Sequence, residues 1–247
     1  MTGIGSHVFE GCKSLESITI PEGVTSLGSS TFERCRSLKS ITIPKSVTEL
    51  DTSVFSECTS LESIVLPDSL TLIGGCAFFG CSSLKNITIP KGVTCISDAA
   101  FWGCSSLKSI TIPDSVTKIY KNAFCGCSSL ESIVVDKNNK VYDSRDNCNA
   151  IIETSSKKLL IGCKNTVIPK GLTQIGHSAF RNGSIENITI PKGVTSIESH
   201  AFSGCSNLKS ITIPKGVTSI ESYAFDQCSN LESITIPDSV TEIEEGA

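Results

Sequence analysis

One phenylalanine recurs every 23 residues along most of this chain. Six copies follow one another at that spacing, and after a single gap of 56 residues three more follow at steps of 22 and 23. A fixed period in this range is the signature of a solenoid, in which each repeat buries its apolar face only against its neighbours. The marker residues are Phe9, Phe32, Phe55, Phe78, Phe101, Phe124, Phe180, Phe202 and Phe225.

Each repeat contains a short apolar alternation that predicts a β-strand. In one unit Leu38 precedes Ser40-Ile41-Thr42-Ile43, where isoleucines alternate with hydroxyl residues. Strand side chains point alternately to two faces, so the isoleucines are expected inside and the hydroxyls outside. All nine prolines close such a segment, where a residue that cannot donate to a strand ladder is tolerated. The sequence predicts ten strands, and a helical turn on the outer side around each marker phenylalanine.

The consensus of the repeat, L-x-S-I-T-I-P-x-x-V-T-x-I-x-x-x-A-F-x-x-C, resembles the BspA-like leucine-rich repeat. Near-copies of this string cover essentially residues 4–247. They depart from the general leucine-rich pattern, in which Asn or Cys follows the strand, because Gly or Ser stands there. The resemblance implies a right-handed solenoid, an α/β horseshoe that is mostly β, with a parallel sheet on its concave face. It also implies adhesion or recognition by a surface or secreted protein of bacteria or mucosal protists.

Composition and charge narrow the classes of function. The 247 residues carry a net charge of −4 and no basic patch interleaved with aromatics, which argues against a nucleic-acid partner. No apolar run has transmembrane length, and no signal peptide is evident. We expect residues 1–247 to form a single monomeric repeat domain that is cut through a repeat at both ends. Its export signal and anchor would then lie outside this sequence.

Thirteen cysteines raise the question of disulfides or a metal site. Eight of them lie three residues after a marker phenylalanine, one per coil, which predicts a row of small buried thiols. Zinc needs ligands that converge within a coil or loop, and this row does not offer them. No Ser/His/Asp or Cys/His constellation is evident either. We therefore expect no metal, no cofactor and no enzymatic activity.

The gap between Phe124 and Phe180 predicts a β-hairpin insertion at about residues 136–163. A turn centred on Ser155-Ser156 brings apolar residues opposite one another and opposite charges together, which supports the register. The expected pairs are Glu153 with Lys158, Ile152 with Leu159, Ile151 with Leu160, and Cys148 with Cys163. For the last pair two alternatives stay open: a cross-strand disulfide, or a buried cysteine in the place of the motif leucine.

Charged residues flank each predicted strand, and their signs mostly alternate between neighbouring coils. Opposite charges on adjacent strands contribute about 0.2–1 kcal/mol each. Two interpretations stay open: the alternation fixes the register of neighbouring coils and keeps the protein soluble, or it forms a mixed-charge face for a protein partner. The candidate binding residues on that face are Lys85 and Lys108. The row before the strand contains Glu16, Lys39, Glu62, Lys85, Lys108 and Glu131.

The residue after each marker phenylalanine is mostly polar, so this row is expected to be exposed. Phe79, Trp102 and Cys125 interrupt it in three consecutive coils. Aromatic residues are enriched at interaction hot spots, and adjacent exposed apolar side chains mark contact sites. We expect a binding patch there; the alternative is that the rings cover a gap on the outer side. Weaker candidates are Tyr120 and the pair His200 and Tyr223.

These observations predict a non-enzymatic scaffold at a cell surface, or secreted, that binds a protein or glycan partner. Its many strands would present a wide, preorganised surface, so that binding orders little chain. The alternative is a passive spacer within a larger surface protein.

Overall fold

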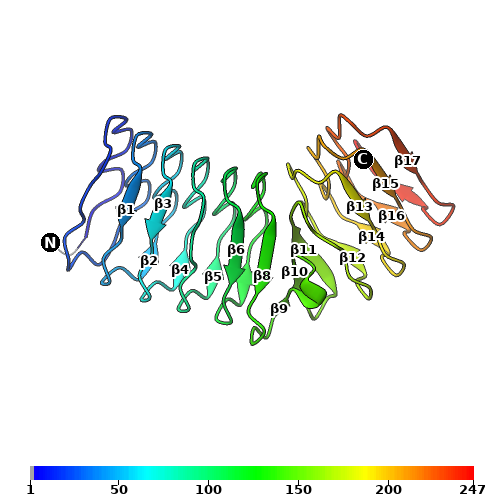
Figure 1. Cartoon of the computed structure of the whole chain (residues 1–247), viewed down its shortest axis with the longest axis horizontal. Coiled ribbons are helices and arrows are strands. Elements are labelled where there is room, and N and C mark those ends of the chain that lie inside the picture. The colour runs from blue at the N-terminus through cyan, green and yellow to red at the C-terminus, as the bar shows by residue number, and fades with distance from the viewer. Residues whose placement is uncertain (1–2) are drawn as a thin grey trace. The chain divides into compact units, whose positions relative to one another are not determined.

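The computed structural model describes residues 3–247 and shows a β-solenoid in which coils stack on one another (Figure 1). The chain divides into two compact units, Met1–Cys127 and Ser128–Ala247. Each unit has its own ladders of short strands, and each is described by itself. The single domain expected from the sequence stays a prediction.

Two parallel ladders run through the first unit. β1 pairs with β3, and Ser63 of β3 bridges to Asn86. The second ladder, β2-β4-β5-β7, is built from the Val-Thr-x-Ile segment after each proline, and the sequence analysis did not anticipate it. The strands are β1 (Ser40–Thr42), β2 (Glu49–Leu50), β3 (Ser63–Val65), β4 (Leu72–Ile73), β5 (Cys95–Ile96), β6 (Ser109–Ile112) and β7 (Lys118–Ile119).

The second unit repeats this plan and adds antiparallel strands. One sheet has the order β13-β15-β17, and the other has the order β18-β16-β14-β12-β11-β10-β9. The elements are β8 (Ser132–Val135), β9 (Tyr142–Asp143), the 3₁₀ helix η1 (Arg145–Asn147), β10 (Ala150–Glu153), β11 (Lys158–Gly162), β12 (Gln174–Ile175), β13 (Asn187–Thr189), β14 (Ser196–Ile197), β15 (Ser210–Thr212), β16 (Ser219–Ile220), β17 (Ser233–Thr235) and β18 (Glu242–Ile243). Seven of the ten expected segments thus form strands: β1, β3, β6, β8, β13, β15 and β17.

The segment around each marker phenylalanine forms hydrogen-bonded turns instead of a helix. In one coil the Cys35 amide donates to the Phe32 carbonyl at 3.1 Å, while the Phe32 amide donates to Val54 of the next coil at 2.9 Å. Ser30 and Arg34, two residues before and after Phe32, both have left-handed backbone angles, with φ of 56° and 59°. A right-handed helix cannot continue through such residues. Among residues 3–247 the assigned helix is η1 alone.

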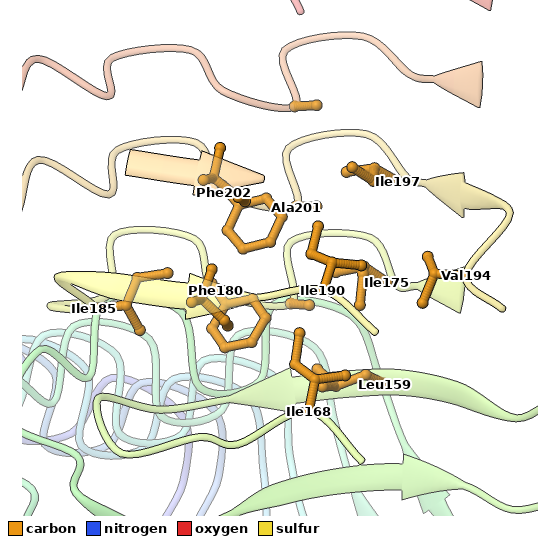
Figure 2. Packing of buried hydrophobic residues seen from close by; sticks show 14 of the residues in the cluster. Leu159, Ile168, Ile175, Phe180, Ile185, Ile190, Val194, Ile197, Ala201 and Phe202 are labelled. Carbon is orange, nitrogen blue, oxygen red and sulfur yellow. The ribbon is translucent and has the colours of Figure 1, made fainter. Parts of the chain in front are cut away.

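The marker phenylalanines form a continuous column of stacked rings in the core of each unit. Neighbouring ring centroids in the first unit lie 5.1 to 5.6 Å apart, with Phe55 and Phe78 at the long end. Figure 2 shows the rings of Phe180 and Phe202 in successive coils of the second unit, where their centroids lie 5.1 Å apart. Buried isoleucines pack beside the rings, as the strand alternation predicts.

The cysteine row lies beside this column, as expected for buried thiols. The Cys81 Sγ donates a hydrogen bond to the Phe55 carbonyl of the preceding coil at 3.1 Å, and six other coils repeat this contact. Burial raises the pKa of the Cys81 thiol well above its ordinary value. The thiol therefore fills a small apolar space and satisfies a backbone acceptor on the neighbouring coil.

All thirteen cysteines are free thiols, so the alternative of a Cys148–Cys163 disulfide is wrong in this structure. Cys163 is buried with 5% exposure, and its Sγ donates to the Asn149 carbonyl at 3.3 Å. This placement matches the other alternative, in which Cys163 takes the place of the motif leucine.

The predicted hairpin forms from β10 and β11, but a register shift of one residue displaces two of the four expected pairs, Ile151 with Leu160 and Cys148 with Cys163. Glu153 pairs with Lys158 as predicted, but Ile151 pairs with Ile161 and not with Leu160. The register shifts between Ile151 and Ile152 because a β-bulge leaves one extra residue on the β11 side.

The hairpin is an integral part of the second unit. β11 pairs in parallel with β12, so the insertion occupies the position of a coil in the second ladder. The side chain of Phe180 packs directly over Gly162 at the end of β11, where an added Cβ would clash with the ring. The hairpin thus closes one end of the phenylalanine column of this unit.

Candidate binding surface

The structure brings together Phe79 and Trp102, which lie directly after the marker phenylalanines Phe78 and Phe101 on the turns of two adjacent coils. Their ring centroids lie 6.3 Å apart with 24° between the planes. Each turn is bonded to its neighbour: the Gly80 amide donates to the Trp102 carbonyl at 2.7 Å. We call these two rings the aromatic patch.

The expectation that this whole row is exposed is wrong. Phe79 and Trp102 are half-buried, whereas Ser56 and Cys125, on the coils to either side, are buried with 6% and 5% exposure. Backbone bonds join these turns coil to coil, so small side chains in the row are covered by the neighbouring turns. Only longer side chains emerge, which leaves the two rings bounded by small residues on both sides.

Charged groups lie beside the aromatic patch. The Glu57 carboxylate sits over Gly80, at 2.9 Å from the position that a Cβ would take there. The Glu57 Oε2 lies 3.7 Å from the Arg36 Nη2. A half-buried aromatic centre next to charged groups is the arrangement found at protein interaction hot spots, where a polar rim surrounds an apolar core.

The candidate lysines belong to a different row of the coil. The Lys85 Nζ lies 2.7 Å from the Glu62 Oε2, and this contact lowers the pKa of the Glu62 carboxyl. The Lys108 amide donates to the Lys85 carbonyl at 3.2 Å, so the two lysines occupy adjacent coils. The Lys85 pair, like the 2.9 Å pair of Lys39 and Glu16, fits the interpretation that alternating charges support the coil register.

Tyr120 lies on a third row, directly after β7, and is 42% exposed. The Lys118 Nζ stands 4.3 Å from the centroid of its ring, a cation–π contact. The five candidate residues therefore occupy three separate rows, and of these only Phe79 and Trp102 form a ring pair.

A second aromatic group lies in the second unit, and the sequence analysis had named only part of it. His200 stacks on Tyr223 with centroids 5.1 Å apart, and His177 meets His200 edge-on at 5.8 Å. Burial, reinforced by the charge of Arg181, lowers the pKa of His200 despite the opposing effect of Asp226. The missed signal was that His177 precedes Phe180 by three residues and His200 precedes Phe202 by two, which places them on equivalent turns of adjacent coils.

Within residues 3–247, no group of three or more His, Cys, Asp or Glu side chains is arranged to hold a metal ion. The described part of the chain also has no helix with the length and apolar character needed to cross a membrane. A pocket of about 310 Å³ lies over Ser17–Ile20 and Ser40–Thr42 and is lined mainly by hydroxyl and isoleucine side chains.

The family comparison accounts for the whole sequence. The family model described as "BspA type Leucine rich repeat region" matches in six copies, over residues 1–74, 57–154 and 151–247. No curated protein matches the chain.

Several solved structures share this fold, among them proteins from Faecalibacterium prausnitzii, Bacteroides ovatus and Eubacterium ventriosum. A leucine-rich cell surface protein from Faecalibacterium prausnitzii is 28% identical with a TM-score of 0.67, over 100% of this chain and 83% of that one. A leucine-rich repeat protein from Bacteroides ovatus is 26% identical with a TM-score of 0.54, over 100% and 80%. One from Eubacterium ventriosum is 23% identical with a TM-score of 0.65, over 94% and 82%, and shows the fold alone.

Proposed function

Since this chain belongs to the BspA-type leucine-rich repeat family, we propose that it is a non-enzymatic binding scaffold for a protein partner, at a cell surface or secreted. The family is one of repeat scaffolds. The similar Faecalibacterium prausnitzii protein, described as a cell surface protein, supports the location.

The observation that carries the proposal is the aromatic patch. A lone exposed apolar residue is ordinary, but Phe79 and Trp102 form a stacked pair on adjacent coils with charged groups beside it. Backbone bonds on both sides hold their turns, so a partner would meet rings that are already positioned. In this proposal the secondary contacts with the partner are made by Lys85, Lys108 and Tyr120.

Aromatic substitution tests the proposal. The double variant Phe79→Ala/Trp102→Ala would be compared with the unchanged protein for binding to immobilised matrix proteins and mucins. A hot-spot aromatic contributes about 2 kcal/mol or more, so the loss of even one such contact is expected to weaken saturable binding by at least about 30-fold. Val167→Ala is the control, because it removes an exposed apolar side chain from the other unit at a position with no proposed binding role.

A folding check separates binding from stability. The urea midpoint of the double variant would be measured by circular dichroism, with Trp102→Phe as a milder variant that keeps a ring in the stack. Weakened binding in a folded variant supports the proposal. Binding that survives in both folded variants, or that Val167→Ala weakens equally, would refute it.

A passive spacer is the second candidate, and the regularity of the coil contacts favours it. Thr71, Thr94 and Thr117 each donate a side-chain hydrogen bond to the threonine carbonyl of the preceding coil, at 3.1 to 3.4 Å. Such a ladder stiffens the stack without specifying a ligand. Absence of saturable binding to every protein and glycan tested would favour this candidate.

A further inference from the structure

One row of charges in the second unit departs from the alternation seen elsewhere. The residue after each strand-closing proline alternates in sign through the first unit, from Glu22 to Asp114. In the second unit it is lysine in three successive coils, at Lys170, Lys192 and Lys215. Each is followed by a glycine with positive φ, so the same Pro-Lys-Gly turn is repeated three times. We call these three residues the lysine row.

The strand registers place the lysine row in line along the stack. The Lys192 turn joins β13 to β14, and the Lys215 turn joins β15 to β16. β13 pairs with β15 and β14 pairs with β16, both in parallel and without a register shift. β12, directly after the Lys170 turn, pairs with β14 in the same way. Successive lysines are therefore about one strand spacing apart, roughly 4.8 Å at the backbone.

The lysine side chains are exposed and uncompensated. All three residues are exposed, and within residues 3–247 none of their ammonium groups takes part in a hydrogen bond or an ion pair. Lys39 and Lys85, by contrast, each pair with a glutamate of the preceding coil. Like charges on adjacent strands cost stability, so the row has no evident structural benefit.

We infer that the lysine row binds a linear anionic polysaccharide, whose sulfate or carboxylate groups repeat along an extended chain. An extended polyanion meets several evenly spaced ammonium groups at once, which a single small anion does not. Exposed threonines border the row at Thr189, Thr195, Thr212 and Thr218, and their hydroxyls suit the hydroxyls of sugars.

Other polyanions fit this surface less well. Single-stranded nucleic acid is held by aromatic residues on which bases stack, whereas each of these lysines stands between a proline and a glycine. Recognition of an anionic membrane uses clusters of four to eight basic residues, more than the three of this row. The inference does not depend on the aromatic patch, which belongs to the other unit.

The test uses heparin as the probe, a linear sulfated polysaccharide, with neutral dextran as its uncharged counterpart. The variant K170Q/K192Q/K215Q would be compared with the unchanged chain at low ionic strength. The matched control K13Q/K45Q/K91Q makes the same change in net charge at three exposed lysines of the first unit. Loss of the row is expected to weaken heparin binding by at least about tenfold and to flatten its salt dependence.

The outcomes separate the inference from its rivals. A loss confined to the K170Q/K192Q/K215Q variant, with dextran not bound, supports it. Equal losses in both variants would mean diffuse electrostatics and would overturn it, as would equal affinity for single-stranded DNA or for anionic vesicles. The urea midpoint of the variant should stay or rise, because repulsion is removed; a clear fall would show a structural role instead. Heparin binding is expected to persist in Phe79→Ala/Trp102→Ala, which keeps this test distinct from that of the proposed protein partner.

Discussion

The stacked phenylalanine column allows a quantitative prediction about the first unit. Phe78 is fully buried and its ring stacks on both neighbours, at 5.6 Å to Phe55 and 5.3 Å to Phe101. Phe78→Leu keeps an apolar side chain but removes two ring pairs, each worth about 0.5–1.5 kcal/mol. With the small cavity that remains, the loss in unfolding free energy should be about 2–4 kcal/mol.

The measurement is urea unfolding followed by the fluorescence of Trp102, the single tryptophan of the chain, which lies in the same unit. Phe9→Leu is the control, because Phe9 is only half-buried and stacks on Phe32 alone. Its loss should be about 0.5–1.5 kcal/mol, from one ring pair. If the two variants lost the same free energy, the stacked column would not be the source of the stabilisation, and the reasoning would fail.

Three further predictions concern the thiols, the turns and the hairpin. Stability should fall as pH rises above the ordinary thiol pKa of 9.0, because buried thiols such as Cys81 ionise only in the unfolded chain. Each such thiol lowers the free energy of unfolding by about 1.4 kcal/mol per pH unit above that pKa. A urea midpoint that is equal at pH 8 and pH 10 would contradict this. Gln227→Gly should raise the melting temperature, because Gln227 has a φ of 56° that costs a non-glycine residue about 1 kcal/mol; an unchanged or lower value counts against the strain argument. Gly162→Ala should cost about 1–3 kcal/mol through its clash with Phe180, whereas Gly75→Ala, where the added Cβ would have an ordinary 3.6 Å contact, should be nearly neutral in the same thermal unfolding experiment.

The period and the strand alternation predicted the solenoid, because both follow directly from which side chains must be buried. The second ladder escaped notice, although its signal is present in each repeat: Val47 and Leu50 are buried while Thr48 and Glu49 between them are exposed. Its strands are two residues long, so no run of alternation is long enough to stand out in the sequence.

The exact register of the hairpin and the burial of single turn residues depend on contacts that the residue types alone do not specify. Ile151 pairs equally well with a leucine or an isoleucine, so the bulge that selects Ile161 left no trace in the pattern of residue types. The burial of Ser56 and Cys125 likewise comes from the turns that cover them and not from their polarity. For the candidate surface, the sequence predicted the neighbouring positions of Phe79 and Trp102, and the structure adds their stacking geometry.

The hairpin also bears on how such a chain avoids misfolding. Near-identical coils offer almost the same partner at every step, so a growing stack can pair one coil out of step and still satisfy most of its contacts. β11 differs in sequence from the other strands, pairs with β12 on one side, and ends at a glycine on which the Phe180 ring packs. A stack that slipped by one coil in this unit would lose the packing of the Phe180 ring on Gly162. The insertion thus supplies a unique pairing site that the repeat itself lacks, and it fixes which coil stacks next to it.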